Sequence, residues 1–206
     1  MAIKFFIHPP LGNLSGELRL NVEAIRIADS LGIDGFILPD HYMSPRSNDT
    51  LEAWVTLAHL AAVTSHIMLG TLVTPIPLRP PQLLAKIVST VDVLSEGRSL
   101  LGVGAGWWKE EFEAYSKWDN PKVRVEKVDE GVALIKRLWT ESKVDFEGKH
   151  YRAKGAVLLP SPCRSLILLS CSEEKALKCW SWRENTLIFA SSAKKSRKNS
   201  WPLKMK

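Results

Sequence analysis

The chain has 206 residues, of which 45% are hydrophobic and 24% are charged. This length is typical of one domain, and this composition excludes wholesale disorder because it provides enough apolar side chains for a core. No apolar run reaches the roughly 18 residues that span a bilayer, and the first ten residues lack the features of a secretory signal. We therefore expect a cytoplasmic protein that has no membrane partner.

The net charge of +6 is distributed unevenly along the chain. Residues 175–206 contain nine basic residues and one acidic residue, whereas residues 1–174 contain 19 basic and 21 acidic residues. The mildly acidic balance of residues 1–174 argues against a nucleic-acid partner. The basic tail suits either a solvated chain end or a surface that binds nucleic acid or anionic lipid.

The first half of the chain alternates short apolar runs with longer segments of helical periodicity. In chain order, we predict strand 3–7, helix 17–31, strand 35–38, helix 49–65, strand 67–73, helix 81–94 and strand 99–103. The capping-box-like pair Asp49 and Glu52 begins the second helix, and Pro75 breaks the third strand. Strands that are apolar throughout predict a parallel sheet buried on both faces. A closed eightfold barrel and an open doubly wound sheet both fit, and both carry their chemistry at the carboxyl ends of the strands.

The pattern becomes less regular after the fourth predicted strand. We predict helices at 108–115 and 123–139, a hairpin at 144–152, a candidate fifth strand at 166–169 and an aperiodic basic segment from residue 190. We therefore expect an α/β unit over residues 1–174 and an irregular basic tail over residues 175–206. Lys86, Lys109 and Asp92 are assigned to solvated helix faces.

Candidate functional residues follow the predicted strands at their carboxyl ends. Asp40 and His41 follow the second strand, residues 71–74 end the third, and residues 102–108 end the fourth. A histidine at this position can donate or accept a proton near physiological pH. The alternative is a loop pair in which Asp40 caps the turn and His41 is merely exposed.

The glycine-rich run at residues 102–106 has the spacing G-x-G-x-G, which differs from the dinucleotide fingerprint G-x-G-x-x-G. The acids Glu110, Glu111 and Glu113 follow it and would repel a phosphate. We therefore exclude pyrophosphate binding here. Small residues would instead let a flat ring approach the backbone, with Trp107 and Trp108 beside it or in the core. The sequence contains no nucleophile elbow, Walker loop or metal-ligand cluster, so an organic cofactor is the economical source of reactivity.

Several of these segments carry a family resemblance. The segments are Pro39-Asp40-His41, residues 69–75 (LGTLVTP), 92–98 (DVLSEGR), 101–107 (LGVGAGW) and 146–151 (FEGKHY). In this order and with these intervals, residues 3–162 resemble the bacterial luciferase-like flavin-dependent oxidoreductases. This superfamily also contains enzymes that use the deazaflavin coenzyme F420.

The resemblance implies a (β/α)8 barrel of the TIM type that holds an isoalloxazine ring at the carboxyl end of its strands. It gives His41 a catalytic position near the reactive face of the ring. It also implies a non-proline peptide, often cis, within residues 71–73 behind the ring. The cofactor-binding residues that follow from it are Asp40, Thr71, Leu72, Val73, Gly104, Ala105, Gly106, Trp107, Ser170 and Ser172.

The chain also departs from this family pattern. Its 206 residues are fewer than the roughly 250 of a complete barrel, so we expect an incomplete barrel of about four to five βα units. Residues 170–173 (SCSE) stand where the family has a glycine-rich phosphate loop, and the family pattern ends after Lys178. This break indicates a truncated or frameshifted reading frame. An open half barrel leaves strand edges exposed, which favours a homo-oligomer.

Three functional hypotheses follow. The first is a flavin-dependent monooxygenase or oxidoreductase that uses reduced FMN and oxygen on a small organic substrate, with no metal. The second is a hydride-transfer oxidoreductase that uses F420. The third, from another class, is an inactive barrel remnant or a binding protein with a basic tail.

Overall fold

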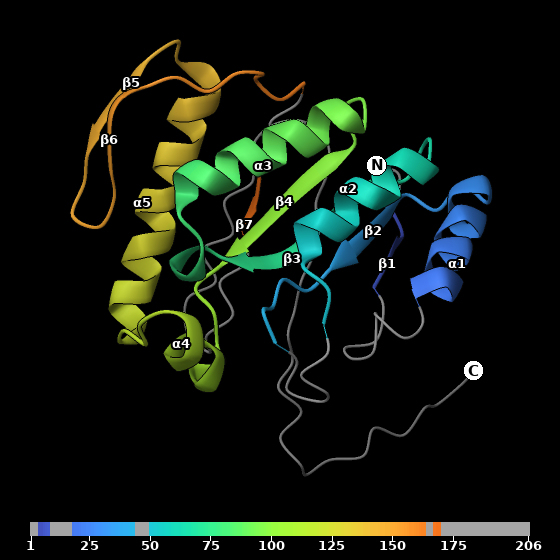
Figure 1. Cartoon of the computed structure of the whole chain (residues 1–206), viewed down its shortest axis with the longest axis horizontal. Coiled ribbons are helices and arrows are strands. Elements are labelled where there is room, and N and C mark those ends of the chain that lie inside the picture. The colour runs from blue at the N-terminus through green and yellow to red at the C-terminus, as the bar shows by residue number, and fades with distance from the viewer. Residues whose placement is uncertain (1–3, 9–17, 44–49, 164–166, 170–206) are drawn as a thin grey trace, which may run out of the picture.

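The computed structural model describes residues 4–8, 18–43, 50–163 and 167–169 (Figure 1). Five parallel strands form its main sheet, in the order β1 (Phe6–Ile7), β2 (Gly35–Leu38), β3 (Met68–Pro75), β4 (Ser99–Gly104) and β7 (Ile167–Leu169). This order follows the chain without the reversal that defines a doubly wound sheet, so it is the order of consecutive barrel strands. That these strands belong to an incomplete (β/α)8 barrel stays a prediction.

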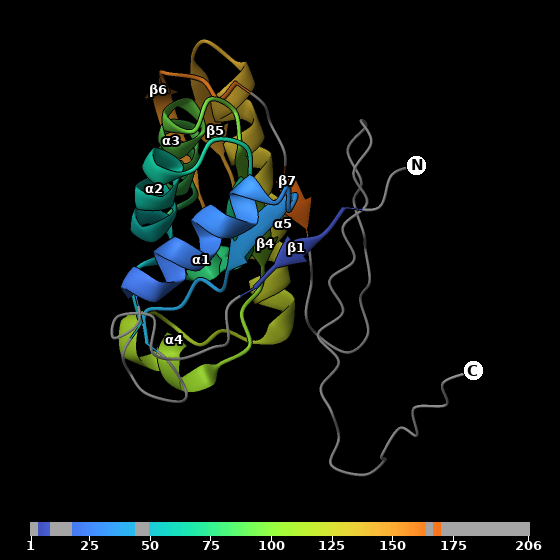
Figure 2. The same cartoon turned by 90° about the vertical axis from the view of Figure 1, so that its right-hand side faces the viewer.

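Helices connect successive strands on one face of this sheet. They are α1 (Leu18–Ser30), α2 (Ala53–Val63) and α3 (Pro81–Leu94), and the edge-on view shows all three on the same side (Figure 2). After β4 come α4 (Lys109–Tyr115) and α5 (Pro121–Thr140), and then a hairpin of β5 (Val144–Glu147) and β6 (Arg152–Ala156). Helix α5 packs on α3, where the Trp139 indole donates to the Ala85 carbonyl at 3.0 Å.

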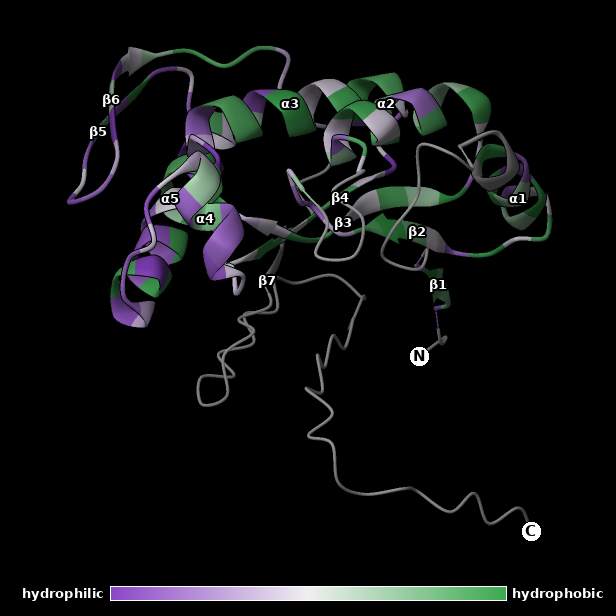
Figure 3. Cartoon of the chain, turned by 60° about the horizontal axis from the view of Figure 1, so that its bottom comes forward, coloured by the Kyte–Doolittle hydropathy of each residue, from purple (hydrophilic) through white to green (hydrophobic). Residues whose placement is uncertain are grey.

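The core lies between the sheet and these helices. Alternate strand residues, among them Phe36, Leu69 and Leu101, are buried against apolar residues of the helices. The helical contribution includes Ile25, Leu57, Leu60, Leu84, Val88, Leu134 and Ile135. The central strands are mostly hydrophobic in colour, whereas α4 and α5 carry broad hydrophilic faces (Figure 3). Burial of this apolar surface holds the carboxyl ends of the strands in fixed relative positions.

The predicted elements agree closely with the described ones. The bounds of β2 and α3 match the prediction, and β7 confirms the fifth strand, which pairs in parallel with β4. Other bounds differ. Helix α2 begins at Ala53, because the Glu52 side chain caps it by accepting from the Val55 N–H at 2.6 Å. Strand β1 begins only at Phe6, and β3 continues past residue 73 to Pro75, where it ends. Asp49, the boundary at 174/175 and the basic tail lie outside the described residues.

Strand β3 contains one extra residue near its carboxyl end. Thr71 pairs with Leu101 and Thr74 with Val103, so three steps along β3 match two along β4. The Leu72–Val73 peptide within this bulge is cis, which confirms the non-proline cis peptide implied within residues 71–73. Side chains three positions apart normally point to opposite faces of a strand. The bulge instead brings the Thr71 and Thr74 hydroxyl oxygens to 3.0 Å from each other.

Candidate active site

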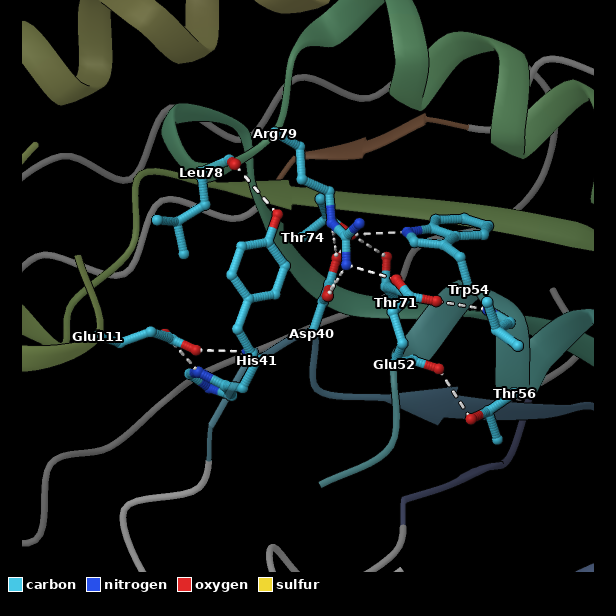
Figure 4. Close-up of polar contacts among 12 residues, drawn as sticks. Asp40, His41, Glu52, Trp54, Thr56, Thr71, Thr74, Leu78, Arg79 and Glu111 are labelled. Carbon is cyan, nitrogen blue, oxygen red and sulfur yellow. Dashed lines mark hydrogen bonds and ion pairs between the residues drawn. The ribbon is translucent and has the colours of Figure 1, made fainter. Parts of the chain in front are cut away.

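A buried ion pair lies at the carboxyl ends of β2 and β3 (Figure 4). Asp40 follows β2 and is 1% exposed. Arg79 donates from Nε and Nη2 to the two Asp40 carboxylate oxygens, at 2.8 and 2.6 Å. The Thr74 hydroxyl donates to the same carboxylate at 2.7 Å. This two-point contact, typical of arginine and carboxylate, fixes the orientation of both groups.

Further hydrogen bonds tie this ion pair to α2 and β4. Arg79 Nη2 also donates to Glu52 Oε1 at 2.6 Å, and the Trp54 indole donates to the Thr74 hydroxyl at 3.2 Å. The Thr71 hydroxyl donates to the Gly102 carbonyl at 3.2 Å. The cap of α2, the bulge of β3 and the end of β4 therefore form one connected polar network.

Burial and charge act in opposite directions on this pair. Burial raises the pKa of the Asp40 carboxyl, and the hydrogen bonds and charge of Arg79 oppose that rise only in part. Burial alone would lower the pKa of the Arg79 guanidinium, but the hydrogen bonds to Asp40 and the Asp40 charge raise it. Arg79 therefore stays charged. It supplies most of the interactions that offset the desolvation of the Asp40 carboxylate.

His41 is held by a carboxylate from α4. Its Nδ1 lies 2.8 Å from Glu111 Oε2, and the two side chains are 14% and 1% exposed. Glu111 Oε1 accepts from the backbone N–H of Tyr42 at 2.6 Å and of Met43 at 3.4 Å. One buried side chain of α4 thus fixes both the imidazole and the backbone that follows it.

Aromatic rings surround His41 and the residue after it. The ring centroids of Trp107 and Trp108 lie 5.9 and 6.2 Å from that of His41, both in edge-on geometry. The Tyr42 hydroxyl donates to the Leu78 carbonyl at 3.1 Å, and the Arg79 guanidinium lies 5.0 Å from the Tyr42 ring centroid. Burial raises the pKa of Tyr42. The Tyr42 phenol therefore remains a hydrogen-bond donor at neutral pH.

The glycine-rich end of β4 has no room for a side chain at two of its positions. A Cβ on Gly102 would lie 2.2 Å from the Thr71 carbonyl oxygen, and one on Gly106, whose φ is +78°, would lie 2.3 Å from the Phe112 ring. The fold itself therefore needs both glycines. Within this run Ala105 is buried, whereas Trp107 is 51% exposed and offers the most side-chain surface.

The structure brings most of the predicted site residues to one edge. His41 contacts Trp107, and residues 71–75 pair with 101–104 of β4. Ser170 and Ser172 lie outside the described residues. The sequence interpretation missed Arg79 as the partner of Asp40, and it treated Glu111 only as a repulsive charge. The available signal for Glu111 was its place between Trp108 and Tyr115, at spacings of three and four within one apolar stripe.

Comparison with known proteins identifies the family of this chain. Residues 1–188 match the luciferase-like monooxygenase family, and the chain belongs to that family. The family resemblance inferred from the motifs is therefore confirmed.

Individual relatives differ in their named activities. The chain is 34% identical over 146 residues to the F420-dependent glucose-6-phosphate dehydrogenase of Segniliparus rotundus, which covers 68% of this chain and 43% of the relative. It is 31% identical over 129 residues to the pyrimidine monooxygenase RutA of Pseudomonas syringae, which covers 61% of this chain and 36% of the relative. The chain thus spans less than half the length of these two relatives.

Solved structures show the same fold. Monooxygenase RslO1 from Streptomyces bottropensis superposes with a TM-score of 0.72 at 26% identity, covering 82% of this chain and 53% of that one. An F420-dependent secondary alcohol dehydrogenase in complex with an F420–acetone adduct superposes with a TM-score of 0.69 at 21% identity, covering 81% of this chain and 51% of that one. The arrangement of β1 to β4 and their helices is therefore that of larger enzymes.

The part of the chain that the structure describes contains neither a membrane-spanning helix nor a cluster of metal ligands. None of its helices there combines the length and the hydropathy that crossing a membrane requires. No group of three or more histidine, cysteine or acidic side chains in the same ranges is placed to hold a metal ion. The groups at the site are instead an imidazole, indole rings and a strand bulge.

Proposed function

We propose that this chain forms the ring-binding part of a flavin-dependent oxidoreductase, with the isoalloxazine ring of FMN at the carboxyl ends of β2, β3 and β4. One observation carries this proposal: His41, the Leu72–Val73 bulge and Trp107 converge on one edge of the sheet. The carboxyl end of a barrel is also where enzymes of this architecture carry out their chemistry.

The residues at this edge suit a flat tricyclic ring. Leu72 and Val73 are partly exposed, and Trp107 presents an indole stacked at 22° on Trp108 with 6.2 Å between centroids. Aliphatic and indole surfaces favour stacking of an aromatic ring. In this proposal Leu72, Val73 and Trp107 contact the ring. Asp40 and Thr71 act through the network behind the bulge, Gly104, Ala105 and Gly106 form the strand end beside the ring, and Ser170 and Ser172 bind the cofactor phosphate.

The chain's own side chains contribute binding and proton handling. When bound, reduced FMN supplies two electrons, with which oxygen would place one atom in a small organic substrate and release the other as water. His41 would exchange a proton with the substrate through Nε2. The indoles of Trp107 and Trp108 would keep water away from the reacting face.

A deazaflavin enzyme is the second candidate. It is favoured by the 34% identity to a relative that is named F420-dependent. In that case a hydride passes between the substrate and F420, and oxygen takes no part. The same edge residues would hold the ring, because the two cofactors share a flat tricyclic system.

The wider setting of the site is also part of the proposal. We infer a small organic substrate, a cytoplasmic location and a (β/α)8 barrel architecture of which this chain forms only a part. We also infer a homo-oligomer, because β1 pairs only with β2 within the described sheet and so leaves a strand edge. Light scattering of the purified chain would test the oligomer directly, and a monomer at all concentrations would contradict it.

The direct test is a titration with each cofactor. FMN and F420 are added separately to the purified chain, and quenching of the ring fluorescence is followed. We expect saturable quenching by one of them with a dissociation constant in the range of about 1–100 μM. Circular dichroism confirms that the chain is folded. A folded chain that quenches the ring fluorescence of neither cofactor would contradict the proposal.

A further inference from the structure

We propose that Glu111 is a positioning residue that holds His41 in the tautomer with the proton on Nδ1, so that Nε2 is left as the proton-accepting atom. The tautomer follows from the contacts alone. Only the use of Nε2 in turnover rests on the proposed function. Three groups determine the tautomer: the Glu111 carboxylate, the imidazole, and the backbone of residues 42–43.

The contacts of Glu111 make it an acceptor on both oxygens. Oε1 accepts from the backbone N–H of Tyr42 and Met43, which have no acceptor role at nitrogen. Oε2 lies 2.8 Å from His41 Nδ1. If Nδ1 carried a lone pair instead of a proton, two acceptors would face each other at this distance in a site where Glu111 is 1% exposed. The cost of such an unsatisfied buried contact excludes that tautomer.

The helix presents only one of its acids to the site. Glu110 and Glu113 of α4 are exposed, and Glu113 forms a surface ion pair with Lys109 at 3.4 Å. Glu111 instead lies on the side of Phe112, which is fully buried. Burial of Phe112, whose ring packs edge-on against Trp118, anchors the buried side of the helix, and Glu111 is part of that side.

The imidazole is also restrained against rotation. The indoles of Trp107 and Trp108 contact it edge-on from the segment that precedes α4. None of the described residues hydrogen-bonds to Nε2. Glu111 therefore occupies Nδ1, and Nε2 is the ring nitrogen that is left to hydrogen-bond a ligand.

Nitrogen NMR reads the tautomer without any cofactor. The chain is labelled with 15N-histidine, and long-range proton–nitrogen spectra are recorded at about pH 9, where an ordinary histidine is neutral. The signals of His41 are assigned by their loss in His41→Gln. We expect a protonated-type shift for Nδ1 and an unprotonated-type shift for Nε2 in the wild-type chain.

Glu111→Gln should reverse this pattern. The glutamine oxygen can still accept from the Tyr42 N–H, while its amide NH2 faces Nδ1 and donates to it. The proton of His41 then moves to Nε2, and the two nitrogen shifts exchange. Glu113→Gln is the matched control on the same helix, and it should leave the wild-type pattern unchanged.

Each outcome decides the inference. A wild-type His41 with its proton on Nε2, or with an average of both tautomers, would overturn it, and so would an unchanged pattern in Glu111→Gln. If Glu111→Gln does not fold, as judged by circular dichroism, the wild-type spectrum alone decides. Failure of the proposed function is distinguishable, because it appears in the cofactor titration and not in these spectra.

Discussion

The two ends of the parallel sheet bind charged side chains in different ways. At the amino end, Arg98 donates to the backbone carbonyls of Ala61, Thr64 and Ile67, and Asp29 accepts from three consecutive backbone N–H groups. At the carboxyl end, side chains bind one another across 39 and 70 residues, as Asp40 binds Arg79 and Glu111 binds His41.

This difference separates stability from chemistry. Backbone groups at the amino end have fixed positions, so the side chains there join the ends of helices to the starts of strands. Side-chain pairs at the carboxyl end instead orient each other, and His41 among them can exchange a proton with a substrate. In barrel enzymes, residues at the amino end serve stability and those at the carboxyl end serve catalysis. Substitutions at both ends of the sheet test this division between stability and catalysis.

Arg79→Ala should destabilise the chain by about 4 kcal/mol, because it leaves the Asp40 carboxyl buried without its counter-ion. Urea denaturation at pH 7 measures the loss. Burial raises the pKa of Asp40, so the loss should shrink as the pH falls and the carboxyl becomes neutral. Adding Asp40→Asn should restore part of the stability. No recovery in the double variant would show that the pair is not coupled.

Arg98→Ala should cost about 3 kcal/mol, since it removes the donors of several part-buried backbone carbonyls. Unlike Arg79, Arg98 has backbone acceptors, so no single second substitution should rescue it. The same urea experiment serves here. Arg137→Ala, at an exposed ion pair with Glu141, is the control and should leave the urea midpoint nearly unchanged. A loss at Arg98 as small as this control would contradict the comparison.

Trp107→Ala should weaken cofactor binding about tenfold, or about 1.4 kcal/mol, because it removes the exposed indole beside His41. Its effect on stability should be small. Phe5→Ala removes another exposed aromatic ring, just before β1 at the amino end, and should leave binding unchanged. Equal dissociation constants for both variants and the wild-type chain would place the ring elsewhere.

Asp29→Asn should give the smallest effect, about 1 kcal/mol at pH 7. Burial raises the pKa of Asp29, but the N–H groups of Ser65, Ile67 and His66 outweigh it and lower the pKa below the usual value. The ionised carboxylate therefore stabilises the fold above about pH 4, and this contribution is lost as the pH falls through the folded-state pKa. Urea midpoints should differ at pH 7 and converge once the pH has fallen below the folded-state pKa of Asp29. A difference that is constant with pH would reject the charge as its cause.

The sequence predicted features that depend on local pattern or on motif. The apolar runs and Pro81 defined β2 and α3 to the residue, and the family resemblance located the cis peptide within residues 71–73. Features that depend on distant contacts were missed. Asp92 was assigned to a solvated face, yet it is fully buried and accepts from the Ser99 N–H and hydroxyl, which the helical pattern alone does not reveal.

The same reason explains Arg79 and Glu111. Their partners lie 39 and 70 residues away, and only the packing of η1 (Ile76–Leu78) and α4 against the strand ends brings them together. An acid within a helix usually indicates a solvated face. An acid inside an apolar stripe, as Glu111 is, instead indicates a buried carboxylate with a partner from another element.

Backbone amide NMR of the chain during cofactor titration tests the central claim most directly, because it reports on both ends of the sheet at once. We expect shifts at residues 40–43, 71–74, 104–108, 170 and 172 on addition of FMN or F420, with no change at Asp29, residues 65–67 or Arg98. Shifts concentrated at the amino end, or spread evenly over both ends, would contradict the assignment of the ring to the edge that His41 and Trp107 share.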